Sequence, residues 1–220
     1  MPGSSVIRLF RFRPVSREFD SIIRDVLVPD LRRLPGVIDV YTGRQGPDEL
    51  GPRLIASVWE SRRAMAAAVG ETFRQPKFHP ELLNESSDRE LEFLPLAFGL
   101  RFQRDEAAAI LRLGRGQVRP LELDSYVADA REGTLADSRR GRGPLALYLA
   151  PDGPDRFVTL SLWADWTSLQ EATGGNVRNP TATRHAERLI AWEAAHFEAL
   201  PNDPDPIPVS APLTASFALD

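Results

Sequence analysis

Few side chains in this sequence have an ordinary pKa near neutral pH. Cys is absent from the 220 residues, which excludes a thiolate nucleophile, a thiolate metal ligand and any disulfide bond. The three histidines, His79, His185 and His196, show no metal-ligand spacing such as HxxxH or HExxH, so no metal site is expected. His196 is the candidate general base, because an imidazole with a pKa of about 6.5 exchanges a proton near neutral pH. A structural histidine is the alternative interpretation.

Two arginines and several polar or aromatic side chains complete the candidate site. Arg8 and Arg112 each interrupt an apolar, strand-like run, where a guanidinium could stabilise an anion. Structural ion pairs are the alternative for both arginines, and core packing is the alternative for the aromatic residues. The candidate ligand-contacting residues are Trp59, Trp163, Tyr41, Tyr148 and Ser161. No dinucleotide fingerprint, P-loop or GxSxG motif is present, and we expect no cofactor.

The sequence repeats itself. Trp59 corresponds to Trp163, an offset of 104 residues, and Arg8 corresponds to Arg112 at the same offset. Further matches at this offset pair Ser57 with Ser161, Gly70 with Gly174, Pro76 with Pro180 and Phe93 with Phe197. Tyr41 and Tyr148 match at an offset of 107. These separated matches with one spacing predict a duplicated unit.

Each copy is predicted to run strand, helix, strand, strand, helix, strand. In the first copy, alternating apolar residues predict strands over 6–13, 37–42, 54–59 and about 92–96, and a helical apolar period predicts a helix over 19–34. Ser61 and Asp165 are predicted N-caps of the helices that follow the third strands, and Gly70 and Gly174 are predicted to end those helices. In the second copy we expect a helix over 183–195, including Trp192, and a last strand over 196–200. The Pro-rich end is predicted to be an extended arm.

This order of elements predicts an α+β fold of two ferredoxin-like βαββαβ repeats in tandem. Each repeat would have an antiparallel sheet with helices on one face, and the two bare faces would pack together as a closed or nearly closed α/β barrel within one chain. The expected units are 1–104, 105–201 and the arm 202–220. One chain would thus be a pseudo-dimer, and a further homodimer stays open.

Strand alternation predicts which side chains enter the barrel. Apolar residues shared by both copies, such as Leu9 with Leu113 and Val58 with Leu162, are expected to face the helices. The barrel interior is expected to hold Arg8, Arg112, Ser57, Thr159, Ser161, Trp59, Trp163, Asp39, Tyr41, Tyr148, Glu92, His196 and Glu198. Gly114 and Gly116 replace Phe10 and Phe12, so a cavity is expected in the second copy.

The stretches Leu34–Val37, Val40–Arg44 and Ser57–Ser61, with Leu162–Asp165 and Ala195–Glu198, resemble the dimeric α/β-barrel proteins of the antibiotic-biosynthesis-monooxygenase type. The resemblance covers about 5–98 and 108–200. It implies a cofactor-independent monooxygenase acting on a small aromatic or polyketide-like molecule in the barrel. His196 would be the base, Arg8 or Arg112 the anion stabiliser, and the tryptophans and tyrosines the walls.

Other functions remain open, and whether the chain is an enzyme is not decided by sequence. The same cavity could bind a small molecule without chemistry, or the barrel could be structural. Haem binding or degradation is a third reading of the family resemblance, but the first strand offers no Asn and only His79 approaches the expected histidine. The net charge of −4 gives no reason to expect nucleic-acid binding, and no apolar run is long enough to cross a membrane. A cytoplasmic protein is expected.

Overall fold

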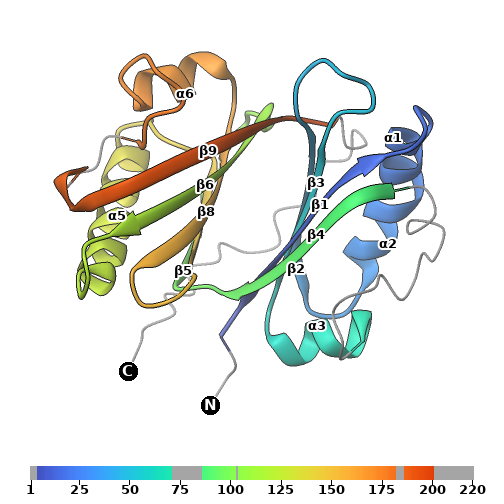
Figure 1. Cartoon of the computed structure of the whole chain (residues 1–220), viewed down its shortest axis with the longest axis horizontal. Helices are drawn as coiled ribbons and strands as arrows, with labels where there is room; N and C mark the ends of the chain where they lie inside the picture. The colour runs from blue at the N-terminus through green and yellow to red at the C-terminus, as the bar shows by residue number, and fades with distance from the viewer. Residues whose placement is uncertain (1–3, 71–85, 103, 182–185, 201–220) are drawn as a thin grey trace.

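The computed structural model describes residues 4–70, 86–102, 104–181 and 186–200 (Figure 1). In chain order the elements are β1 (Val6–Pro14), α1 (Phe19–Ile22), the π-helical turn η1 (Ile23–Leu27), α2 (Val28–Arg33), β2 (Val37–Arg44), β3 (Arg53–Trp59), α3 (Arg62–Val69), β4 (Ser86–Pro95), β5 (Phe98–Arg101), β6 (Ile110–Val118), α5 (Leu123–Arg139), β7 (Ala146–Pro151), β8 (Arg156–Trp163), α6 (Trp166–Ala172), the 3-10 turn η2 (Ala186–Arg188) and β9 (Leu189–Ala199).

The described strands form one antiparallel sheet in the order β4-β1-β3-β2-β9-β6-β8-β7-β5. In this order, β4, β1, β3 and β2 come from the first half of the chain, and β9, β6, β8 and β7 come from the second half. The strand at the far edge, β5, again comes from the first half. Helices α1, α2 and α3 cover the outer face of the first half, and α5 and α6 cover the outer face of the second (Figure 1). The predicted tandem ferredoxin-like fold with an intrachain α/β barrel is therefore confirmed.

The two halves of the sheet are joined at two places. At one junction Gly43 of β2 pairs with Ala199 of β9. At the other, the chain leaves β4 and enters β5, which pairs with β7 of the second half. There the N–H of Leu96 donates to the carbonyl of Ser5, and the N–H of Ala97 donates to the carbonyl of Leu149, at 2.8 and 2.9 Å. Leu96 thus bonds to the first half of the chain and the next residue, Ala97, bonds to the second half. These two hydrogen bonds hold the two ends of the sheet together and close the barrel.

The helices that follow the third strands, α3 and α6, begin at the predicted N-caps. The hydroxyl of Ser61 accepts a hydrogen bond from the N–H of Ala64, and the carboxylate of Asp165 accepts one from Ser168. Gly70 closes α3 with a φ of 89°, a value that other residues rarely adopt. Gly36, with a φ of 80°, also lies where a Cβ would come within 2.5 Å of the Ala64 Cβ, so the helix packs directly against this turn.

The space between the two halves of this sheet, β4-β1-β3-β2 and β9-β6-β8-β7-β5, which we call the two sheets, is filled by an apolar core. Its buried residues are Ile7, Leu9, Leu54, Ala56, Val58, Leu111, Leu113, Ala146, Tyr148, Ala150, Val158, Leu160, Leu162 and Phe197. Separate cores lie between each sheet and its helices: one in the first half contains Phe10, Trp59 and Met65. The second half has two, one around Leu123 and Phe157 of α5 and β8, and one around Trp163 and Leu169. Both faces of the sheet are therefore buried.

Two predictions about the second half are wrong. The stretch expected to be a helix up to Ala195 is instead η2 followed by β9, because the residues from Leu189 onward pair with β6 along its whole length. The expected cavity at Gly114 and Gly116 is occupied: a Cβ at Gly114 would overlap the ring of Trp192, and one at Gly116 would overlap Phe157. The boundaries of the three predicted units stay predictions, and the predicted arm lies outside the described residues.

Gly114→Ala is expected to lower the free energy of unfolding by about 2 kcal/mol, because the added methyl must displace the Trp192 ring and the Thr159 hydroxyl. Gly133→Ala is the matched control: the position lies within α5 with open space around it, so the change should raise stability by about 0.5–1 kcal/mol. Chemical denaturation of both variants measures the difference. Equal effects would show that the glycine does not accommodate the tryptophan.

Candidate functional site

The predicted direction of the central site residues is wrong. Trp59 packs with Met65 and Val69 of α3, and Trp163 packs with Leu169 of α6, so both tryptophans lie between sheet and helices. Arg8 and Arg112 are on this same face of β1 and β6, since alternation puts Arg8 with Phe10 and its guanidinium lies 5.8 Å from that ring. The apolar residues shared by both copies, including Leu9 and Leu113, are the ones that enter the barrel.

The two halves build this face in the same register. Arg8 pairs across the strands with Ser57, and Arg112 pairs with Ser161. In each half the indole N–H of the tryptophan two residues further along donates to the serine hydroxyl, at 2.9 Å in both cases. The predicted site residues Ser161 and Trp163 therefore bond to each other, beside Arg112.

In the second half, Arg112 is the centre of a polar cluster. Its side chain is 2% exposed and donates through Nη2 to the backbone carbonyls of Val177, at 3.2 Å, and Asn179. The guanidinium lies 5.2 Å from the ring of Trp192, which is itself held by a hydrogen bond from its indole N–H to the Arg178 carbonyl. Among the described residues no carboxylate forms an ion pair with Arg112. Burial without such a partner lowers its pKa to about 10.

His196 lies next to this arginine on the neighbouring strand β9. Its ring is 5.6 Å from the ring of Trp166, the first residue of α6, and it is half-buried. Burial, and then the positive charge of Arg112, lower the pKa of His196 below its usual range, while the Val177 carbonyl acts in the opposite direction. Its Nε2 is buried and has no hydrogen-bond partner among the described residues. Both effects favour the neutral imidazole, and one of its nitrogens has no partner among the described residues.

Tyr126 of α5 adds a phenol on the helix side. It is buried, packs against Phe157 at 4.7 Å between ring centroids, and has its pKa raised to about 12 by burial, against the opposing effect of Arg112. We call Arg112, Tyr126, Trp166, Trp192 and His196 the Arg112 cluster. Tyr126 and Trp192 also pack in the helix-side core around Leu123 and Phe157, and Trp166 remains 39% exposed, so the cluster reaches solvent there.

The equivalent place in the first half is packed differently. Arg8 is 3% exposed, and burial lowers its pKa to about 10. Phe10 and Phe12 stack beside it, at 4.9 Å between ring centroids, where the second half has two glycines. Position 92, which corresponds to His196, is Glu92, whose side chain points into the barrel. The structure therefore does not bring the predicted Arg8, Trp59 and His196 together.

Tyr41 and Tyr148 lie inside the barrel, as predicted, but away from the other candidates. Their hydroxyls are 2.9 Å apart, and the Tyr148 hydroxyl donates to the carboxylate of Asp39 at 2.5 Å. Arg101 of β5 completes the group with an ion pair to Asp39 at 2.8 Å. Burial raises the pKa of Asp39 and of both phenols. This network joins β2 of the first half to β5 and β7, so it belongs to barrel closure.

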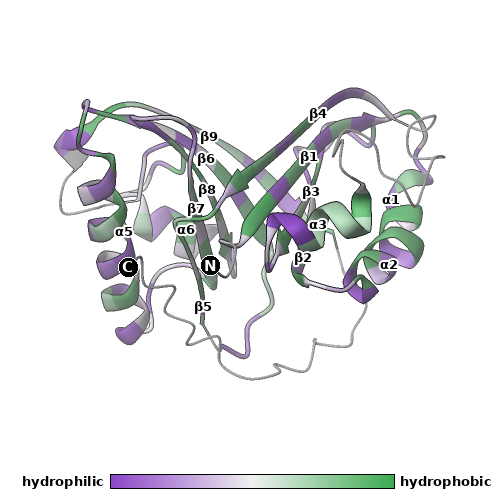
Figure 2. Cartoon of the chain, turned by 90° about the horizontal axis from the view of Figure 1, so that it is seen from below, coloured by the Kyte–Doolittle hydropathy of each residue, from purple (hydrophilic) through white to green (hydrophobic). Residues whose placement is uncertain are grey.

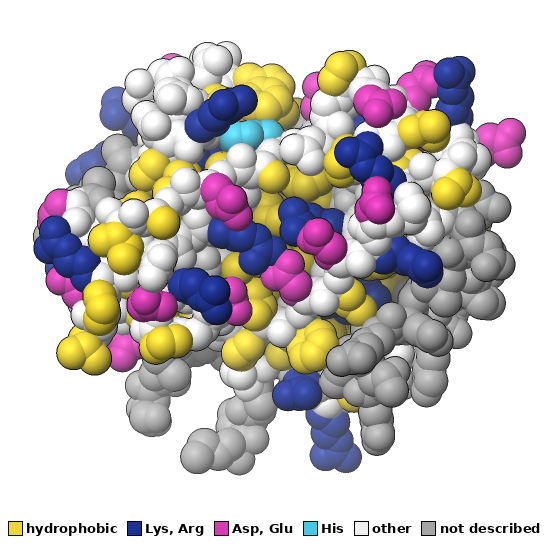
Figure 3. Space-filling model, in the orientation of Figure 1, with side chains coloured by type: hydrophobic (Ala, Val, Ile, Leu, Met, Phe, Trp, Pro, Cys, Tyr) yellow, Lys and Arg dark blue, Asp and Glu magenta, His cyan; other side chains and the backbone are white. Residues whose placement is uncertain are grey.

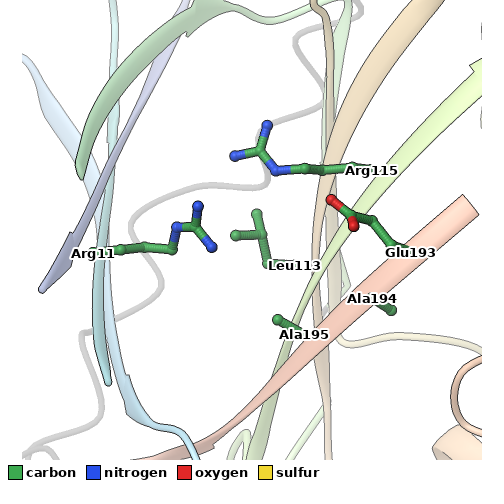
Figure 4. A pocket seen from close by; sticks show the side chains of 6 residues that line it. All are labelled: Arg11, Leu113, Arg115, Glu193, Ala194 and Ala195. Atoms are coloured by element: carbon green, nitrogen blue, oxygen red, sulfur yellow. The ribbon is translucent and has the colours of Figure 1, made fainter. Parts of the chain in front are cut away.

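A small pocket lies where the two sheets diverge, which gives the V-shaped profile in Figure 2. Its volume is about 150 Å³, and it is lined by Arg11, Leu113, Arg115, Glu193, Ala194 and Ala195 (Figure 4). The two arginines are equivalent in the repeat, and charged side chains of both signs surround the hollow at the surface (Figure 3). We call this the wedge pocket. None of its lining residues was predicted as a site residue.

Besides the residues of the wedge pocket, the sequence prediction missed Tyr126, Trp166 and Trp192 of the Arg112 cluster, and Arg101 of the network around Asp39. Trp192 was assigned to a helix, which hid its position beside Arg112. The sequence did contain a signal for this position. Gly114 and Gly116 lie in a strand, and glycines in a strand often mark a place where a large ring packs directly on the backbone. Among the described residues no group of His, Asp and Glu side chains could hold a metal ion, and no helix is long and apolar enough to cross a membrane.

The fold and its paired halves define a dimeric α/β-barrel protein of ferredoxin-like type, with both barrel halves supplied by one chain. No protein-family model and no curated protein sequence matches this chain. Solved structures do. A putative monooxygenase from Fusobacterium nucleatum is similar, with a TM-score of 0.69 and 10% sequence identity over 91% of this chain and 94% of that one. A putative monooxygenase from Lactobacillus acidophilus is similar too, with a TM-score of 0.70 and 8% identity over 90% of this chain and 95% of that one. An anthrone oxidase-like protein is also similar, with a TM-score of 0.56 and 12% sequence identity over 89% of this chain and 91% of that one.

Proposed function

We propose that this chain is a cofactor-independent, monooxygenase-like enzyme acting on a small aromatic or polyketide-like molecule, and that the Arg112 cluster is its site. One observation carries the proposal: a buried arginine without a carboxylate partner lies beside a histidine whose Nε2 is buried and unpartnered. A buried, unpaired cation is costly unless an anion forms next to it. The names of the structural neighbours agree with this class of activity.

The chemistry requires a base, an anion stabiliser and dioxygen. For a substrate with an activated CH₂ group, His196 removes one proton, and Arg112 stabilises the resulting anion. The carbon electron pair forms a C–O bond with dioxygen, which is reduced to the level of a peroxide bound to substrate. Loss of the second proton from carbon breaks the O–O bond and yields a ketone and water. The balance is R₂CH₂ + O₂ → R₂CO + H₂O, and no external reductant is needed.

The placement of this chemistry differs from the expectation for the barrel interior. The interior is filled by core side chains, whereas the Arg112 cluster reaches solvent beside Trp166. Trp166 and Trp192 supply aromatic surfaces on either side of the two polar groups, which suits a planar substrate. The second half therefore carries the proposed site, and Phe10 and Phe12 fill the corresponding place in the first half.

A binding protein without turnover is the second candidate. It is favoured by the fixed position of Arg112, whose Nη2 already donates to two carbonyls, so part of its capacity to bind an anion is used. Anthrone is a suitable probe for both candidates, because its oxidation to anthraquinone and water follows the balance given above. A change in tryptophan fluorescence without oxygen uptake would favour binding alone.

Oxygen uptake with anthrone tests the proposal. The wild-type chain is expected to consume one O₂ for each anthrone lost, and Arg112→Gln is expected to lower kcat by about a hundredfold, because the anion loses its charged donor. Arg119→Gln removes the same charge from an exposed position beyond β6 and should leave kcat unchanged. No uptake by the wild type, or equal rates in both variants, would contradict the proposed role of Arg112.

A further inference from the structure

We propose that the wedge pocket is a second ligand site, independent of the Arg112 cluster, which binds a small monoanionic carboxylate of about the size of benzoate. Arg11 and Arg115 occupy equivalent positions in the two halves, on β1 and β6. Alternation directs both side chains between the sheets, on the same faces as Leu9 and Leu113. Their guanidinium groups enter the hollow from opposite walls (Figure 4).

The shape of the pocket fits an amphipathic molecule. Leu113 and Ala195 form an apolar floor that continues into the barrel core, and the charged groups line its sides. A cavity of about 150 Å³ is large enough for a benzene ring. The floor would therefore contact a ring or short aliphatic body, while a carboxylate would lie between the two guanidinium groups.

Both arginines keep hydrogen-bond donors for such a ligand. Arg11 pairs with Glu90, and Arg115 pairs with Glu92 at 2.5 Å, in each case through Nη2. A guanidinium has five N–H donors, so one contact leaves most of them unused. Partly exposed ion pairs of this kind contribute little stability, and a ligand carboxylate can share or replace the glutamates.

The acidic residues around the pocket limit the charge of the ligand. Glu193 lies opposite Arg115 on β9 and lines the pocket, and its side chain has no hydrogen bond or ion pair among the described residues. With Glu90 and Glu92 nearby, a second negative charge on the ligand would be repelled. A monoanion is therefore preferred to a dianion. A hydroxyl or amino group beside the carboxylate could donate to Glu193.

Calorimetric titration of the full chain with benzoate tests this site. Saturable binding is expected in the millimolar range, and phthalate, a dianion of similar shape, should bind at least about threefold more weakly. Arg11→Gln and Arg115→Gln should each weaken benzoate binding by about tenfold, since each removes charge-assisted donors. Arg13→Gln is the matched control, because this arginine is on the same strand and pairs with Asp88 but does not line the pocket. It should change the affinity by less than about twofold.

Two further variants separate binding from structure. Glu92→Gln breaks the bridge between the halves but keeps the arginine, so benzoate should bind as tightly or more tightly. Arg115→Gln breaks the same bridge but should weaken benzoate binding by about tenfold, because it also removes the cationic donors. The proposal is overturned if benzoate gives no saturable heat, if Arg13→Gln weakens binding as much as Arg11→Gln, or if Glu92→Gln abolishes it. Loss of binding in His196→Gln would place the carboxylate in the Arg112 cluster and equally overturn the proposal.

Discussion

His196→Ala is expected to lower turnover by about a thousandfold while leaving substrate affinity within about threefold, if the Arg112 cluster acts as proposed. General base catalysis contributes about 10²- to 10⁴-fold, and no other neutral base lies beside Arg112 among the described residues. The Trp166 and Trp192 surfaces remain in the variant, so binding should persist. Single-turnover oxygen uptake measures the chemical step, and tryptophan quenching measures the affinity.

The pH profile gives an independent check of this assignment. Burial and the charge of Arg112 lower the pKa of His196, so the ring stays neutral, and able to accept a proton, to more acidic pH than a free imidazole. Activity should therefore be kept as the pH falls to about 6.5 and should decline only below that value. Glu198→Gln, two residues further along β9, is a suitable control, because its carboxylate pairs with Arg44 instead. An acidic limb centred above 6.5, or full turnover without the imidazole, would exclude His196 as the base.

The sequence predicted the architecture but inverted the faces of five strands, β1, β3, β6, β8 and β9. Repeat spacing, caps and turn glycines are local features, and those at Ser61, Gly70 and Asp165 agree with the structure. The direction of Arg8 and Arg112 was inferred from alternation, on the premise that the apolar positions face the helices. In a closed barrel both faces of a strand are buried. Alternation therefore shows which residues share a face, but it does not show whether that face lies toward the helices or toward the barrel interior.

The composition of the site shows the same difficulty. Arg112, Ser161, Trp163 and His196 were grouped correctly because alternation and the repeat put them on one face of adjacent strands. Tyr126 and Trp166 lie on helices, and the alternation pattern of the strands does not specify which part of the sheet a helix contacts. The wedge pocket depends on the angle at which the two sheets diverge, and that angle is a property of the whole core.

Asp39→Ala is expected to lower the free energy of unfolding by about 3 kcal/mol, because it leaves the buried Tyr148 hydroxyl without its carboxylate acceptor and removes the ion pair with Arg101. Asp39→Asn keeps an oxygen that can accept from Tyr148, and Arg101 is 36% exposed and can be hydrated, so this variant should lose only about 1 kcal/mol. Tyr41→Phe should also lose about 1 kcal/mol, since the bond from Tyr148 to Asp39 survives. Denaturant unfolding of the three variants measures these differences.

The pH dependence of the same variants has a defined sign. Burial raises the pKa of Asp39 above its unfolded value, so the folded state binds this proton more tightly than the unfolded chain does, although Arg101 and Tyr148 act in the opposite direction. Its contribution to stability is then complete below the unfolded pKa of about 3.9 and is lost as the pH rises through the folded pKa. In Asp39→Asn this dependence should disappear, and the unfolding free energy should fall less steeply than in the wild type as the pH rises above about 4. Because the network connects β2 to β5 and β7, an unchanged pH dependence in Asp39→Asn would mean that Asp39 does not titrate as part of barrel closure.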